Sequence, residues 1–478
     1  MKHQVIFSFI GLMLFTQCAG PANDTPEFAA VSTVESGKPV AVMLTAYSTT
    51  LLANGTDRTR LRIAVVDSLG REITSCTDSI RLVIIGDGVV KAVDGTELLQ
   101  QMDSSGQTYF ACQLQQGVTN LVFIAGKTPD CIKVEASRKE LWPGSHEIHT
   151  LPANFVLLKP TQEQLPPVTK PIDRMIGADI SFLPQIEAQG INFYDNGNEK
   201  DALTLLHDHG FNAIRLRIFV NPENEKGYSP GIGYCGLPQT LEMAKRIRAS
   251  GMNLLLDFHY SDYWADPQQQ NKPLAWADLE FEALQDSVKA YTEYVLLALK
   301  EQGTLPAMVQ IGNEINHGIL WPDGHISHPD QLAGLLMAGV EGVRAVDPGL
   351  PVMMHLALGG QHEEAVFWLD NLIARGVQFD VIGLSYYPRW HGILDDLQEN
   401  MRDLITRYKK PVNVVEYSNY KKEVHEIVFG LPDNMGKGAC IWEPLNWRSD
   451  LFTKEGNTTE VIRIYDDLKE RFLPDSTR

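Results

Sequence analysis

Two spacings of apolar residues divide the chain into two regions. From about residue 37 to 150, short runs in which apolar and polar residues alternate are separated by turns rich in Gly and Asp. Beyond residue 172, apolar runs of five or six residues alternate with longer segments of helical spacing. The first pattern predicts antiparallel β-strands, and the second predicts strands that alternate with helices.

Eight apolar runs of the second region have the length of buried strands. Helices are expected between them, for instance at residues 201–209, 240–249 and 281–302, each followed by a glycine that ends the helix. Eight strands with intervening helices over about 300 residues predict a (β/α)8 barrel. The predicted strands are residues 175–180, 213–219, 253–258, 308–313, 351–355, 381–385, 412–416 and 438–442.

The predicted fold class is therefore α/β, with two domains of different kind. A (β/α)8 barrel is expected at residues 173–475, preceded by a small all-β, immunoglobulin-like sandwich at residues 37–150. The proline-rich segment 151–172 predicts a semi-rigid linker between them. Because the sandwich contains no evident grouping of acids or of Ser with His, we expect it to be a spacer.

The N-terminus has the composition of an export signal. Lys2 and His3 precede an apolar run at residues 5–15, which is too short to span a membrane, and Cys18 follows it. Residues 1–18 are thus a predicted signal peptide, and the protein is expected to be secreted or at the cell surface. Cys18 stands where a bacterial lipoprotein is acylated, but Gln17 is unusual before such a site. Plain secretion and an outer-membrane lipid anchor both stay open.

Charge and cysteine content restrict the kinds of partner and metal site that are expected. The net charge is −19 and no run is rich in Lys or Arg, so nucleic acid is excluded as a partner. Membrane contact is expected only through the anchor, and the protein is expected to be a monomer. The five cysteines after Cys18 lack metal-site spacing. His317, His325 and His328 lack helical i, i+4 spacing, which favours a solvated loop over a metal site.

Two glutamates end predicted barrel strands. Glu314 follows the run 308–313 and Glu416 follows the run 411–415. An acid at the end of a buried strand is costly unless it is paired or used, and the chemistry of these barrels lies at the carboxyl ends of the strands. A retaining glycosidase needs two such carboxyls about 5–5.5 Å apart, one to protonate the departing oxygen and one to attack the anomeric carbon. We therefore expect Glu314 and Glu416 to be the catalytic pair.

Other polar and aromatic residues gather at the same strand ends. Arg215 can keep the nucleophile ionised, because a nearby cation lowers the pKa of a carboxyl, and Asn313 can bind a sugar 2-hydroxyl. As alternatives, Arg215 could be an ion-pair partner within the barrel, and His259 could be a satisfied core histidine. The predicted substrate-binding residues are Asp179, Arg215, His259, Trp264, Asn313, His355, Tyr387, Trp390 and Trp442.

Tryptophans are concentrated in the predicted barrel. Six of the eight follow or end its strands, which indicates flat platforms on which sugar rings stack. They are Trp264, Trp276, Trp321, Trp390, Trp442 and Trp447.

Over residues 175 to about 470 the chain resembles glycoside hydrolase family 53, the endo-β-1,4-galactanases that degrade arabinogalactan and pectic galactan. No single motif is specific, but together they are. They are Gly-Ala-Asp-Ile-Ser at 177–181, the segments 211–222 and 257–267, Gln-Ile-Gly-Asn-Glu-Ile at 310–315, Ser-Tyr-Tyr-Pro at 385–388 and Trp-Glu-Pro at 442–444. The first region is similar to the immunoglobulin-like accessory domains of bacterial glycosidases.

The resemblance implies roles and a substrate. It implies that Glu314 is the acid/base and Glu416 the nucleophile, and that the enzyme cleaves β-1,4-galactan and galacto-oligosaccharides internally, with retention. It implies no required cofactor. Some members bind calcium in a long loop after the nucleophile, but residues 417–434 are short and carry few clustered acids, so calcium is allowed but not indicated.

Two rival functions keep the same fold. A mannanase or glucanase of the same clan would use the same pair of acids on another sugar. A non-catalytic surface lipoprotein that binds glycans would need neither acid, and the presence of both Glu314 and Glu416 disfavours it.

Overall fold

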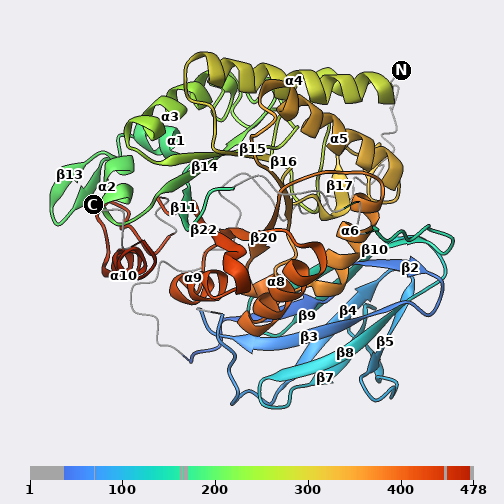
Figure 1. Cartoon of the computed structure of the whole chain (residues 1–478). Coiled ribbons are helices and arrows are strands. Elements are labelled where there is room, and N and C mark those ends of the chain that lie inside the picture. The colour runs from blue at the N-terminus through green and yellow to red at the C-terminus, as the bar shows by residue number, and fades with distance from the viewer. Residues whose placement is uncertain (1–36, 69, 162–163, 165–170, 446–448, 474–478) are drawn as a thin grey trace, which may run out of the picture.

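The computed structural model describes residues 37–68, 70–161, 164, 171–445 and 449–473 of the 478-residue chain. The predicted signal peptide, Cys18 and Trp447 lie outside these residues. Within them the chain forms a β-sandwich followed by a closed barrel (Figure 1). The predicted fold class is confirmed.

The sandwich consists of two sheets with a common apolar core. One sheet has the order β1-β3-β8-β5 and the other β2-β10-β9-β4-β7-β6. Side chains alternate between the core and solvent along several strands, as in β9, because successive residues of a strand point to opposite faces. The strands are β1 (Ala41–Ala46), β2 (Thr50–Ala53), β3 (Arg58–Val66), β4 (Ser79–Ile85), β5 (Gly88–Ala92), β6 (Gln100–Met102), β7 (Thr108–Gln113), β8 (Val118–Ala125), β9 (Cys131–Ser137) and β10 (Gly144–Pro152).

The barrel contains eight parallel strands, and each overlaps one predicted run. The last strand pairs with the first, which closes the ring. The strands are almost wholly buried because helices cover the outside and packed side chains fill the inside, so their sequences are mostly apolar. In ring order they are β11 (Met175–Asp179), β14 (Ala213–Ile218), β15 (Asn253–Phe258), β16 (Met308–Ile311), β19 (Val352–Leu356), β20 (Val381–Tyr386), β21 (Val412–Tyr417) and β22 (Gly436–Trp442).

Amphipathic helices surround the barrel. In α4, Leu284, Val288, Val295 and Leu299 repeat at three- and four-residue steps, so one face is buried against the strands. The longer helices are α2 (Ala202–Asp208), α3 (Leu237–Ala249), α4 (Phe281–Glu301), α5 (Pro329–Val346), α6 (His362–Ala374), α8 (Leu394–Tyr408), α9 (Lys421–Phe429) and α10 (Arg463–Phe472). Shorter ones are α1 (Leu183–Ala188), α7 (Pro388–His391), η2 (Leu274–Trp276), η3 (Ile315–His317), η4 (Pro432–Asn434) and η5 (Glu460–Ile462).

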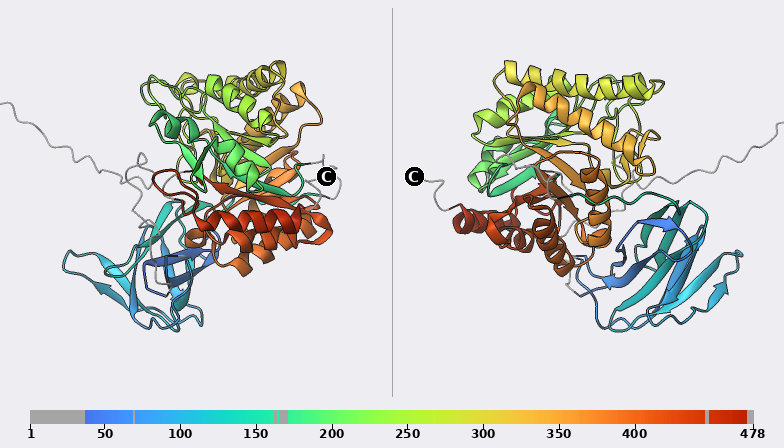
Figure 2. Two further views of the ribbon diagram at one scale, coloured as in Figure 1. Left: turned by 90° about the vertical axis from the view of Figure 1, so that its left-hand side faces the viewer. Right: turned by 45° about the vertical axis from the view of Figure 1, so that its right-hand side comes forward.

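The sandwich packs directly on the barrel, beside α6 and α8 (Figures 1 and 2). Leu151 of β10 belongs to the apolar core of the barrel. The Tyr47 hydroxyl donates to Asp396 of α8 at 3.1 Å. After β10, the Leu158 amide donates to Asn371 of α6 at 3.1 Å, so the described part of the proline-rich segment is docked on the barrel. The sandwich, which was predicted to be a spacer, is thus in direct contact with the barrel.

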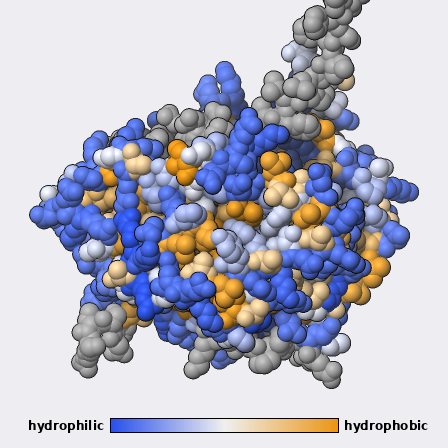
Figure 3. All heavy atoms as spheres, turned by 90° about the horizontal axis from the view of Figure 1, so that it is seen from above, coloured by the Kyte–Doolittle hydropathy of each residue, from blue (hydrophilic) through white to orange (hydrophobic). Residues whose placement is uncertain are grey.

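The face of the molecule seen in Figure 3 is predominantly hydrophilic. On the face seen in Figure 3, apolar atoms form small, separate groups among polar ones. Within the described residues, none of the helices combines the length and the apolar composition that a bilayer crossing requires.

Candidate active site

The two predicted catalytic glutamates lie near each other at the carboxyl ends of barrel strands. Glu416 is part of β21, and Glu314 follows β16 by three residues. The backbone of Glu314 is left-handed, with φ of 49°, a strained conformation for a residue other than glycine. Burial and then the charge of Glu416 raise the pKa of Glu314, the second effect being that expected of neighbouring carboxyls.

Two donors hold the carboxylate of Glu416. Arg215 Nη1 lies 2.9 Å from Oε1, and the Tyr387 hydroxyl lies 3.1 Å from Oε2. Burial raises the pKa of Glu416, whereas Arg215 lowers it, and the carboxylates of Asp179 and Asp257 raise it again. Arg215 acts in the predicted direction, but burial outweighs it and the net shift is upward. That Arg215 keeps Glu416 ionised stays a prediction.

The carboxyl of Glu314 has a different environment. Burial and the charge of Glu416 raise its pKa well above the usual value, and a hydrogen bond from the Ser385 hydroxyl, at 2.6 Å, opposes them only partly. Ser385 itself lies 2.8 Å from His355 Nε2. Glu314 therefore has one neutral donor where Glu416 has a cation and a phenol, so Glu314 keeps its proton to higher pH.

Arg215 is the hub of the site. Its guanidinium has five N–H groups, and each points at an acceptor, so the side chain is fixed in place. The acceptors are Asp179 Oδ2 at 2.9 Å, Glu416 Oε1 at 2.9 Å, Asp257 Oδ2 at 2.8 Å, Asn313 Oδ1 at 2.8 Å and Gln310 Oε1 at 3.2 Å.

Several predicted substrate-binding residues lie behind the catalytic pair. Asp179 accepts from Arg215 and from Ser181, and its side chain is inaccessible. His259 accepts from the Ala265 amide and lies 3.1 Å from Asp257. His355 is likewise buried, and burial lowers its pKa well below the usual value, which keeps it neutral. These side chains support the catalytic groups, and their contact with a substrate stays a prediction.

The predicted aromatic platforms fall into two groups. Trp264 and Trp442 are half-buried, and each meets Phe182 edge-on at 6.1 Å between ring centres. Trp390 is 38% exposed and stands edge-on to Tyr387. Trp276 is buried instead in the core between η2 and α4, so the platform prediction is wrong for this residue. The position of a residue just after a strand does not predict whether the loop that contains it is buried in the core.

Sequence reasoning gave no role to a second buried ion pair. Arg217 Nη1 lies 2.7 Å from Glu443 Oε1, and the Phe182 amide also donates to Glu443. Glu443 directly follows β22, so the rule that identified Glu314 and Glu416 also fits it. Burial raises its pKa well above the usual value and Arg217 opposes the shift. The sequence signal was present. An ion pair does not separate this acid from Glu416, which pairs with Arg215, but Glu416 also interacts with Glu314.

The predicted solvated histidine loop is only partly solvated. His328 is exposed and His325 is half-buried, but His317 is buried. The prediction is wrong for His317 because the sandwich covers it: its ring centre lies 4.2 Å from that of His149 on β10.

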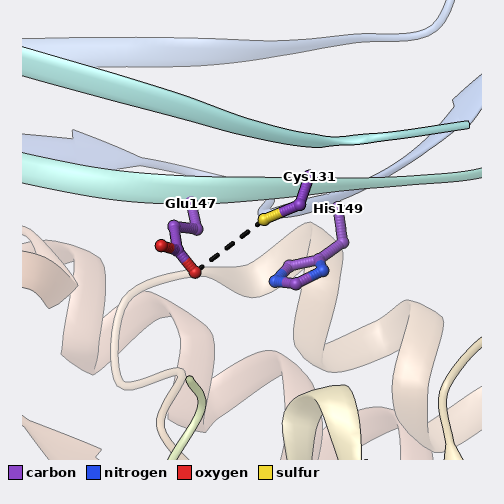
Figure 4. A group of neighbouring side chains, drawn as sticks. All are labelled: Cys131, Glu147 and His149. Atoms are coloured by element: carbon purple, nitrogen blue, oxygen red, sulfur yellow. Dashed lines mark hydrogen bonds between the residues drawn. The ribbon is translucent and has the colours of Figure 1, made fainter. Parts of the chain in front are cut away.

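One group among the described residues could hold a metal ion. Ligand atoms of Cys131, Glu147 and His149 lie within 4.8 Å of one another, on the face of β9 and β10 that is turned toward the barrel helices (Figure 4). Cys131 pairs with His149 across the strands, a spacing that sequence patterns do not reveal. Burial and the charge of Glu147 raise the thiol pKa to about 11. Sulfur and nitrogen ligands suit zinc rather than calcium, and the group belongs to the sandwich, not to the strand ends of the barrel.

Comparisons with known proteins identify the barrel. The model of "Glycosyl hydrolase family 53" matches residues 175–427. A Niallia circulans protein named "Uncharacterized protein in bgaB 5'region" is 40% identical over 312 residues, which cover 56% of this chain and 83% of that protein. "Arabinogalactan endo-beta-1,4-galactanase A" of Aspergillus niger is 34% identical over 341 residues, covering 61% of this chain and 94% of its own.

Solved structures agree. The "Ignisphaera aggregans GH53 catalytic domain" superposes with a TM-score of 0.57 and 32% identity, covering 63% of this chain and 99% of that one. The family match begins at β11 and includes β16 and β21 with Glu314 and Glu416. The chain therefore belongs to glycosyl hydrolase family 53.

Proposed function

We propose that this protein hydrolyses β-1,4-galactosidic bonds within galactan and arabinogalactan chains, with retention of configuration. Membership of the family and the relatives named endo-beta-1,4-galactanase support this substrate. The observation that carries the chemistry is the contrast between two neighbouring strand-end acids. Glu416 accepts from a cation and a phenol, and Glu314 accepts from a single serine hydroxyl.

The contrast assigns the steps of a double displacement. Glu416 attacks the anomeric carbon while Glu314 gives its proton to the departing glycosidic oxygen, so a glycosyl ester forms as the glycosidic bond breaks. Glu314, now ionised, takes a proton from water, which attacks the same carbon and releases Glu416. Arg215 and Tyr387 stabilise the released carboxylate. Two inversions at one carbon give net retention.

Neighbouring side chains would position the sugar. Asn313 donates one amide hydrogen to the Ala265 carbonyl at 2.9 Å, which leaves the second for a substrate hydroxyl. Trp264, Trp390 and Trp442 offer aromatic faces on which a pyranose ring can stack.

Digestion of linear β-1,4-galactan tests the proposal, with β-1,4-mannan and β-1,4-glucan as parallel substrates. Galactan should give oligosaccharides of mixed length early in the reaction, as internal cleavage requires. Proton NMR should show the β-anomer of the new reducing ends before mutarotation. Cleavage of mannan or glucan with galactan left intact would instead support the clan-related alternative, and binding without cleavage would support a glycan-binding protein.

Replacing Tyr387 with phenylalanine should lower kcat/KM on galactan by about 10- to 100-fold. The change removes one hydrogen bond to the ionised Glu416, and such a bond contributes about 1.5–3 kcal/mol. The ring keeps its packing against Trp390, so thermal unfolding should be little changed. Initial rates at several substrate concentrations provide the measurement, and an unaltered kcat/KM would contradict the role of Tyr387.

Replacing Ser385 with alanine should shift the pH profile. The serine hydroxyl stabilises the charged form of Glu314 and so lowers its pKa. Galactan cleavage needs neutral Glu314, so activity is present below this pKa and is lost as pH rises through it. Without the hydroxyl the pKa rises, and the alkaline limb of kcat/KM should move to higher pH. A limb that stays in place or moves to lower pH would count against this account.

We further propose that the protein is exported, acts as a monomer, and needs no cofactor. The composition of residues 1–18 supports export, to the outside or to a lipid anchor at Cys18. Mass spectrometry of the mature N-terminus distinguishes a lipidated Cys18 from a plain cut, and light scattering tests the monomer. Treatment with a chelator should leave the rate of galactan cleavage unchanged. A loss of activity that calcium restores would contradict the proposal that no cofactor is needed.

A further inference from the structure

The sandwich meets the barrel through a buried polar cluster, the Thr49 cluster, which consists of Thr49, Thr50, His317 and Glu364. The Thr49 amide donates to Glu364 Oε2 at 2.5 Å, and its hydroxyl lies 2.7 Å from both carboxylate oxygens. Thr50 adds a bond of 3.0 Å to Oε1. All four residues are at most 6% exposed. Two threonines of the sandwich therefore enclose a carboxylate of the barrel helix α6.

Glu364 is charged although it is buried. Burial raises its pKa, but hydrogen bonds from His317 and Thr49 outweigh burial, so the pKa lies below the usual value. Hydrogen bonds to an ionised group are roughly twice as strong as neutral ones. Removing one of these donors is therefore costly, which makes the junction a defined contact rather than a loose one.

The Thr49 cluster also reaches the segment that carries Glu314. His317 Nε2 lies 3.1 Å from the Thr49 hydroxyl. On its other side, His317 Nδ1 lies 2.9 Å from the Pro267 carbonyl, which can only accept, so this nitrogen carries a hydrogen. His317 ends η3, the short helix that begins immediately after Glu314.

Helix α6 holds the rest of η3. Trp368, one turn after Glu364, donates its indole N–H to the Ile315 carbonyl at 3.0 Å. The Glu314 side chain receives a single hydrogen bond, from Ser385. The position of its carboxyl group therefore depends mainly on the backbone conformation of Glu314 and of η3. That backbone is left-handed at Glu314 and is fixed at Ile315 and His317.

We propose that the sandwich is a positioning element of the active site: Thr49, through His317 and Glu364, holds η3 so that the Glu314 carboxyl is placed for proton transfer. The inference rests on the proposed function, in which Glu314 is the acid/base. It assigns the first domain a catalytic purpose in place of the spacer role expected from sequence. Thr49 and His317 act through Glu314 and are positioning residues.

Substitution of Thr49 by valine in the full chain tests the inference. Valine keeps the shape and the backbone N–H bond to Glu364 but removes the hydroxyl. The matched control is Tyr47→Phe, which removes another hydrogen bond between the domains, to Asp396 of α8, remote from η3. Thr49→Ser restores the hydroxyl. Each variant is assayed on galactan and on a dinitrophenyl β-galactobioside, whose leaving group needs no proton, and its thermal unfolding is recorded.

For Thr49→Val, kcat on galactan should fall by about tenfold, the effect of one hydrogen bond, with KM little changed. The rate of its dinitrophenol burst should stay within about twofold, because this first step needs no proton from Glu314. Thr49→Ser should recover the galactan rate, and Tyr47→Phe should behave as wild type on both substrates.

Two outcomes overturn the inference. The first is a Thr49→Val variant that cleaves galactan at the wild-type rate. The second is an equal loss on both substrates, matched by Tyr47→Phe in proportion to lost stability, which would mean that the contact only stabilises the fold. Wild-type protein that leaves galactan intact contradicts the proposed function itself, and the inference falls with it.

Discussion

Glu416→Ala is expected to lower kcat/KM on galactan on the order of 10³-fold or more. Without the carboxylate no glycosyl ester forms, and water must attack unaided. The fold should survive, because Arg215 keeps the carboxylates of Asp179 and Asp257 as partners. Initial rates, with binding of galacto-oligosaccharides measured by calorimetry, should show lost turnover and retained affinity.

Azide provides the control for this variant. A small anion fits the space that the side chain leaves and attacks the same face of the sugar, so azide should restore turnover of an activated aryl galactoside and give the α-galactosyl azide. Glu443→Gln is the matched acid, since Glu443 is also a buried strand-end glutamate in an ion pair, with Arg217 instead of Arg215. Its loss should affect stability more than turnover. A Glu416→Ala protein with near-wild-type rates would show that the nucleophile is another residue.

Glu314→Gln is expected to lower kcat/KM on galactan by about 10²- to 10⁴-fold, the usual contribution of a general acid. Glutamine keeps the size of the side chain and can still accept from Ser385, but it has no proton of suitable pKa to give. The alkaline limb of the pH profile should disappear, because in the wild type it reports the raised pKa of this carboxyl. The measurement is kcat/KM against pH.

A substrate with a good leaving group distinguishes the loss of the general acid in Glu314→Gln from misfolding of the variant. With a dinitrophenyl leaving group, glycosylation needs no acid, so the first step should proceed at a near-normal rate. Release should be slow for want of the base, so a burst of dinitrophenol followed by a slow phase is expected. Equal losses on galactan and on the activated substrate, with no burst, would remove Glu314 from the role of acid/base.

The barrel could be read from the sequence because its strands are buried on both faces. Mostly apolar runs mark the eight barrel strands, glycines end several of the helices, and each predicted run overlaps an observed strand. The sandwich was less legible. Buried and exposed side chains alternate along strands such as β9, and β2 and β10, which contact the barrel through Thr50 and His149, were not identified individually. Alternation over a few residues is a weak signal.

The two candidate catalytic glutamates were selected by one rule, that an acid at the end of a buried strand needs a use or a partner. The rule does not say which of the two applies. Glu443 meets it equally and pairs with Arg217, but Glu416 also has a partner, Arg215, and differs by its interaction with Glu314. Trp276 followed a strand as the other tryptophans do, yet its loop folds into the core.

The order of residues by itself determined the barrel strands and the positions of Glu314 and Glu416 at strand ends. A buried strand and its end can be recognised from the apolar and polar residues of one short segment. Tertiary structure alone decided what surrounds those acids. Thr49 and His317 are 268 residues apart and share a hydrogen bond that no local pattern encodes. Local propensity fixes the elements, whereas the protonation of a buried carboxyl depends on charges and donors that distant segments bring to it.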